Sequence, residues 1–116
     1  FDGKVASVYA IRQFTQLFPA FTKLPASMLH IAKGKEGEDD NSNLMKEYLS
    51  INYPNLSIQV ATGSADEVII SNAESFTAPL VVMGAYGRSA FSRFFSKSTA
   101  AKLLKEKSWP VFAAHK

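Results

Sequence analysis

The chain contains no cysteine, which excludes disulfide bonds, thiolate catalysis and cysteine-based metal sites. It also lacks any apolar run near the roughly 20 residues that a membrane-spanning helix requires. We therefore expect a cytoplasmic protein that does not contact membranes. Its 116 residues, 47% of them hydrophobic, are enough for one domain with a hydrophobic core, which we expect to span residues 1–116.

Acidic residues are scarce in the C-terminal part of the chain. Residues 1–80 carry six basic and nine acidic side chains, whereas residues 81–116 carry seven basic and one acidic, so the net charges are −3 and +6. This asymmetry indicates an anionic partner, either nucleotide phosphates or nucleic acid. A solvated, lysine-rich helix face is the alternative. We give it equal weight for Lys102, Lys105 and Lys107, but favour a ligand for Arg88 and Lys97.

The spacing of apolar residues predicts four helices alternating with four strands. The helices are expected at residues 8–18, 44–49, 65–76 and 99–107, and the strands at 26–31, 58–60, 80–83 and 111–114. Such alternation predicts right-handed crossovers and a mainly parallel sheet with helices on both faces. Ligands of these folds lie beyond the C-terminal ends of the strands.

Three of these elements carry more detailed predictions. The first helix is predicted from Val8, Ile11, Phe14, Leu17 and Phe18, which recur at helical spacing before Pro19. The third is expected to open with a capping box at residues 64–67 and to bury Val68, Ile69, Ala73 and Phe76. Nothing polar interrupts the strand at 80–83, so burial on both faces is expected there.

The most informative segment is residues 80–100. An apolar strand runs into Gly84 and Gly87, a polar and basic loop follows, and Ser98 opens a helix-like run. A strand, a glycine-rich turn and a helix N-terminus together form a typical pocket for a phosphate or other anion. The spacing alone fits a structural turn equally well. The Walker lysine signature and the dinucleotide Gly-x-Gly-x-x-Gly motif are both absent.

These residues resemble the universal stress protein family over nearly the whole chain. The likeness includes Asp2-Gly3 before a helix, Leu29-His30-Ile31 at a strand end, Thr62-Gly63, and the closing Pro110-Val111-Phe112. It is strongest at Met83-Gly84-Ala85-Tyr86-Gly87-Arg88. The family pattern is Gly, two residues, Gly, nine residues, Gly, then Ser or Thr. The chain matches it at Gly84, Gly87 and Ser98, and has Lys97 at the third glycine position.

The resemblance implies a Rossmann-like, three-layer α/β sandwich, similar to adenine-nucleotide hydrolases, with five strands in the order 3-2-1-4-5. It also implies dimers joined through the last strand, here Val111–Ala114, and in one branch the binding of ATP. Transferred to this chain, the adenosine end would lie near Asp2 and Ile31. The phosphates would lie against the residues of the glycine loop and the next helix start: Met83, Gly84, Gly87, Arg88, Ser98 and Thr99.

Lys97 leaves open how well the domain binds a nucleotide. A lysine at a family glycine position either blocks the phosphate path or supplies an ammonium as a phosphate partner. We therefore predict a non-enzymatic stress-response domain that binds ATP or AMP, with weakened or altered affinity. The alternative is a nucleotide-free scaffold for dimerisation or protein interaction. No histidine and carboxylate pair is placed to activate a serine, His30 is expected to be a packing residue, and no stacking platform supports nucleic-acid binding.

The opening Phe1-Asp2-Gly3 looks like the end of a strand. We expect the sequence to be the C-terminal domain of a tandem family member, with its first strand largely absent. That strand would be central in the implied order. A gap there would expose two rows of unpaired backbone groups, so we expect the full chain or a swapped partner to fill it.

Overall fold

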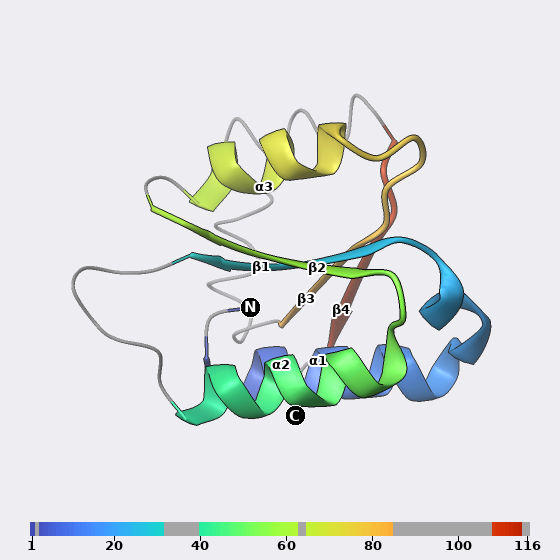
Figure 1. The fold of residues 1–116 in the computed structure, drawn as a ribbon. Coiled ribbons are helices and arrows are strands. Elements are labelled where there is room, and N and C mark those ends of the chain that lie inside the picture. Colours follow the sequence, from blue (N-terminus) through green and yellow to red (C-terminus); the bar gives the residue numbers. More distant parts are fainter. Residues whose placement is uncertain (2, 32–39, 63–64, 85–107, 115–116) are drawn as a thin grey trace.

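The computed structural model of this chain describes residues 1, 3–31, 40–62, 65–84 and 108–114. Figure 1 shows its elements in three layers, with strands in the middle, α3 (Ala65–Glu74) on one face, and α1 (Val5–Leu17) and α2 (Asp40–Asn52) on the other. This confirms the predicted α/β architecture with helices on both faces of parallel strands. The helix expected at residues 99–107 lies outside the described part of the chain.

The described strands form two parallel pairs. They are β1 (Ala26–Ile31) with β2 (Leu56–Ala61), and β3 (Val81–Gly84) with β4 (Val111–Ala114). Three of the predicted strands therefore lie within a residue or two of their expected bounds, and β2 is longer than the alternation indicated. Among the described residues no ladder joins β1 to β3, so the strands form two halves of two strands each.

The first helix buries its small side chains. Ala6, Ser7 and Ala10 are buried, whereas Leu17 is 60% and Phe18 38% exposed. Phe14 of the apolar series is buried, so this series marks the inward face of the helix in part. The small side chains are buried because α1 lies against β3 and β4, and they let its backbone approach the strands. Helix α1 ends just before Pro19, which has no N–H to continue it.

A small hydrophobic core lies between α2 and the β1–β2 half. Met28 of β1 packs with Met45, Leu49 and Tyr53, which come from α2 and the residue after it. Partly buried side chains of α1, among them Val8 and Ile11, pack against this cluster. The first helix therefore contacts both halves of the strand layer.

A buried pair of hydroxyl groups joins α1 to the end of α2. Thr15 Oγ1 donates its one proton to the Ile11 carbonyl at 2.8 Å, so it accepts from the Tyr53 O–H, which lies 2.8 Å away. Burial raises the pKa of Tyr53 above its usual 10.0. The hydrogen bond to Thr15 opposes this shift and the neighbouring Tyr48 adds to it.

The next two elements differ in burial from the sequence prediction. Helix α3 begins at Ala65, and Ser64, the first residue of the predicted capping box, lies outside the described residues. Among its described side chains, Ile70 and Ala73 are the most deeply buried, and the prediction did not include Ile70. Strand β3 is half-buried at all four positions, so the prediction of burial on both faces is wrong. The reason is that, within the described residues, β3 has a strand neighbour only on its β4 side.

Four aromatic rings tie the end of α1 to the last strand. They belong to Phe14 and Phe18, to Phe21 of the 3-10 helix η1 (Pro19–Lys23), and to Phe112 of β4, with neighbouring centroids 5.2 to 6.1 Å apart. Phe14 is the most deeply buried of them and contacts the other three. This aromatic cluster fixes β4 against the helical layer.

Candidate functional site

The C-terminal ends of β1 and β3 both lie against the N-terminal part of the chain, β1 against Phe1 and β3 against Ala6 and Ser7. The terminal nitrogen of Phe1 donates to the Leu29 carbonyl of β1 at 2.7 Å. At the end of β3, a Cβ placed on Gly84 would lie 2.5 Å from the Ser7 nitrogen. The fold thus gathers two strand ends around the start of α1, the place where parallel α/β folds hold their ligands.

A left-handed glycine turns the chain from the edge of β1 into α1. Gly3 has a φ of 77°, a region that side chains with a Cβ adopt only at a cost. Lys4 follows as the N-cap and makes no side-chain hydrogen bond to the first turn, while the Ser7 hydroxyl donates to the Lys4 carbonyl at 2.8 Å. Because the N-cap side chain accepts no hydrogen bond from the N–H groups of the first turn, this helix start favours a nearby negative charge.

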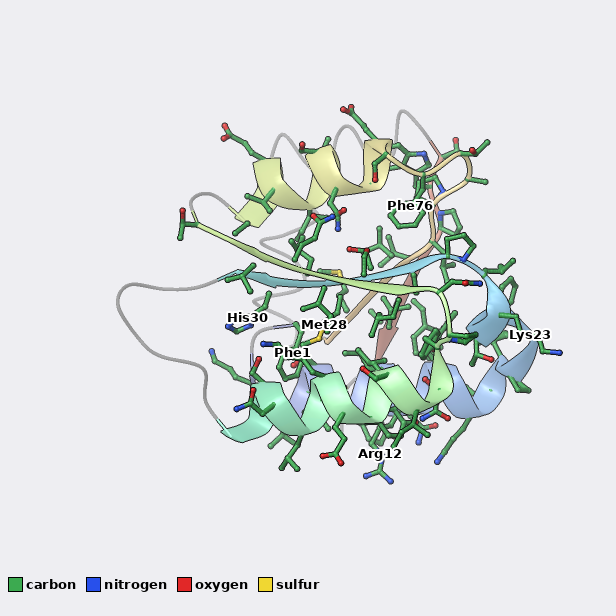
Figure 2. The ribbon with its side chains drawn as sticks, viewed as in Figure 1. Phe1, Arg12, Lys23, Met28, His30 and Phe76 are labelled. Atoms are coloured by element: carbon green, nitrogen blue, oxygen red, sulfur yellow. The ribbon has the colours of Figure 1, made fainter. Side chains whose placement is uncertain are left out.

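His30 holds the N-terminal segment against β1. Its Nδ1 donates to the Phe1 carbonyl at 3.1 Å, and the centroids of the two rings lie 6.0 Å apart. Figure 2 shows both side chains together near the C-terminal end of β1, with Met28 further into the strand. His30 therefore has a packing and hydrogen-bonding role in the described structure.

Gly84 is required for the close approach of α1. An added Cβ would lie 2.5 Å from the Ser7 nitrogen and 2.6 Å from the Ala6 carbonyl carbon. Both atoms are helix backbone, which cannot rotate away as a side chain can. The sequence left open whether Gly84 serves a structural turn or an anion site, and this contact with α1 explains the glycine structurally. A substitution at Gly84 therefore disturbs the packing of α1 whether or not a ligand binds there.

The structure describes three of the predicted binding residues. Ile31 is the last residue of β1, and Met83 and Gly84 are the last two of β3. The remaining ones lie outside the described residues: Asp2, Gly87, Arg88, Lys97, Ser98 and Thr99. Sequence reasoning missed the part played by Ala6 and Ser7, which meet Gly84. The sequence feature that could have indicated this contact is the run of small residues at the start of the first helix.

Two further properties bear on the chemistry of the described residues. No group of three or more His, Cys, Asp or Glu side chains is placed among them to hold a metal ion. None of the helices in the described part of the chain combines the length and the apolar character needed to span a bilayer.

A comparison with protein-family models matches residues 2–115 to the universal stress protein family. The chain belongs to this family. The match includes the Gly84-x-x-Gly87 loop and the closing strand, and so confirms the resemblance seen in the sequence. A universal stress protein domain has a Rossmann-like α/β fold, in agreement with the layers and parallel pairs described above. No curated protein and no solved structure matches the chain.

Proposed function

We propose that this universal stress protein domain binds an adenine nucleotide, ATP or AMP, and serves a stress response without catalysing a reaction. The observation that supports this proposal is the meeting of the β1 and β3 ends at the start of α1. A ligand held there would have strand ends on two sides and a helix N-terminus facing its negative charge.

In the proposed complex the adenosine lies near Asp2 and the backbone of Ile31. The phosphates lie beyond β3, against Met83, Gly84 and Gly87. The basic residues Arg88 and Lys97 and the hydroxyls of Ser98 and Thr99 complete the phosphate site. The net charge of +6 over residues 81–116 supports an anionic ligand.

The proposal extends to architecture and assembly. The two described halves fit the outer strand pairs of a five-stranded sheet in the order 3-2-1-4-5. We propose that β4, which is half-buried at each position, pairs with a second copy or a tandem domain along its outer edge. The protein is proposed to be cytoplasmic and to make no contact with nucleic acid.

A nucleotide-free scaffold is the second candidate. Two observations favour it: the contact of Gly84 with α1 explains this glycine without any ligand, and Lys97 replaces a family glycine. In that case the domain would work through its β4 edge and its partners alone.

Calorimetric titration of the full chain with ATP separates the two candidates. We expect saturable binding, and Arg88→Ala should weaken it by about tenfold or more, because a hydrogen bond to a charged group is lost. Arg12→Ala is the matched control, since Arg12 is exposed on the outer side of the helical layer, away from the strand ends (Figure 2), and it should leave the affinity unchanged. Lack of binding at millimolar ATP would instead support the scaffold.

Two further variants refine the outcome. Tighter binding by Lys97→Gly would show that Lys97 obstructs the phosphate path, whereas weaker binding would show that its ammonium contacts phosphate. Steady ATP turnover that disappears in Asp2→Ala would contradict the non-enzymatic proposal.

A further inference from the structure

We propose that the outer edge of β2 pairs with β2 of a second copy of this chain, the two strands running antiparallel about a two-fold axis at Ile58. The starting observation is that β2, within the described residues, has a strand partner only on its β1 side. Its six residues include no charge and no proline, the features that commonly protect an edge strand from pairing. This surface is distinct from the outer edge of β4, because β2 and β4 belong to different strand pairs.

Hydrogen bonding between β1 and β2 identifies the backbone groups that face outward. The Asn55 carbonyl accepts from the Ala26 N–H, so Asn55 and its alternate neighbours along β2 face β1. The residues between them, Leu56, Ile58 and Val60, therefore present their N–H and C=O groups at the outer edge. In an antiparallel pair centred on Ile58, all these groups find partners in the same three residues of the second copy.

The side chains at these three positions lie on the face of the strand that α2 covers. Ile58 is in register with Met28, which packs on α2, and Leu56 packs against the same core. Even so, Ile58 is 41% and Val60 58% exposed. In the proposed register Ile58 meets Ile58 of the second copy and Val60 meets Leu56. Each apolar side chain on this face therefore lies opposite another.

The other face of β2 is polar and matches itself in the same register. Gln59 and Ala61 line a groove together with Glu67 and Ser71 of α3. Pairing about Ile58 places Gln59 opposite Ser57, so an amide lies beside a hydroxyl group and not beside an apolar side chain. Because β2 carries no charge, its pairing with a second copy sets no like charges against each other.

Helix α2 extends the apolar surface beyond the strand. Leu44 and Ile51 are seven residues apart and so lie on one flank of the helix, where they are 63% and 78% exposed. Tyr53, whose hydroxyl lies 2.8 Å from that of Thr15 in α1, marks the opposite flank. Since α1 contacts β3 and β4 whereas α2 contacts β2, the flank of Leu44 and Ile51 lies on the side of the outer edge.

The exposed area suits a dimer of modest affinity. Over two copies, the exposed parts of Leu44, Ile51, Ile58 and Val60 amount to roughly 900 Å² before the paired backbone is counted, against about 1,200–2,000 Å² in total for a specific interface. An isologous pair about one two-fold axis closes after two copies, so this edge gives a dimer.

The test places charges at the one position that the two-fold axis sets opposite itself. Ile58→Lys and Ile58→Glu each put like charges against each other, and each should weaken dimerisation of the full chain about tenfold or more. Mixed in equal amounts, the two variants should form a one-to-one heterodimer, because opposite charges then meet. Analytical ultracentrifugation measures the affinities, and native mass spectrometry identifies the heterodimer.

Ser57→Lys is the matched control. It adds the same charge to the same strand, but the register sets it opposite Gln59, so dimerisation should change by less than about threefold. Circular dichroism checks that each variant folds. In the unaltered chain, amide exchange at Leu56, Ile58 and Val60 should slow as the concentration rises through the dissociation constant, while Gln59, which faces β1, should not change. This pattern decides if the Ile58 variants do not fold.

Three results would overturn the proposal. One is an unaltered chain that remains monomeric at millimolar concentration. Another is equal association of Ile58→Lys alone, Ile58→Glu alone and their mixture, which would assign the association to another surface such as the edge of β4. The third is exchange at Leu56, Ile58 and Val60 that does not depend on protein concentration.

Discussion

At the scale of single residues, Gly84 decides how closely α1 approaches β3. Gly84→Ala should lower the free energy of unfolding by about 2 kcal/mol, within the range for overpacked sites. The smaller gain of about 0.4–1 kcal/mol from a stiffer unfolded chain does not offset it. Urea unfolding measures the change, and the volume-conserving Met83→Leu should cost less than about 1.5 kcal/mol. Equal stability of Gly84→Ala and the unaltered protein would contradict the described contact with α1.

Tyr53 makes the stability depend on pH at the alkaline end. Because burial raises the pKa of Tyr53 in the folded protein, the folded state holds the phenolic proton more tightly than the unfolded chain does. This contribution is fully present below the unfolded pKa of 10.0 and is lost as the pH rises through the folded pKa. Unfolding by urea at neutral pH and at about pH 11 should show a smaller alkaline loss in Tyr53→Phe than in the unaltered chain. An identical loss in both proteins would contradict this role.

At the scale of secondary-structure elements, the aromatic cluster holds the end of α1 on β4. Phe14→Ala should cost about 3–5 kcal/mol, because it removes the buried ring that contacts the other three. Phe18→Ala, at a position 38% exposed, should cost about 1 kcal/mol. Thermal unfolding followed by near-ultraviolet circular dichroism measures both variants. A cost at Phe18 equal to that at Phe14 would show that the exposed ring is part of the core.

Apolar spacing located most elements but only part of the buried face of α1. The strands at Ala26–Ile31 and Val111–Ala114 have the predicted bounds, because each is a short apolar run between polar or proline-containing segments. The spacing of large apolar residues includes the buried Phe14 but omits Ala6, Ser7 and Ala10. These small residues are buried because α1 packs closely on a strand that ends in glycine. Their burial depends on tertiary contact, which a single helix sequence does not contain.

At the scale of the whole molecule, the parallel α/β class and the family were accessible from sequence, and the contacts of the site were not. Gly84, the first glycine of the loop, is the last residue of β3. Leu29-His30-Ile31, which resembles a strand end of the family, forms the end of β1. The contact of Gly84 with Ala6 and Ser7 joins residues far apart in the chain, and no local motif encodes it. The half-burial of β3 follows in the same way from its neighbours rather than from its own apolar residues.

Helix α1 lies against β3 and β4 through the face that carries its small side chains, and its Val8 and Ile11 pack against the core beside β1 and β2. Melting of either strand pair would expose one flank of this shared helix and remove support from the other pair. The cooperativity of the domain therefore depends on α1, and we expect the two strand pairs to unfold together in one thermal transition.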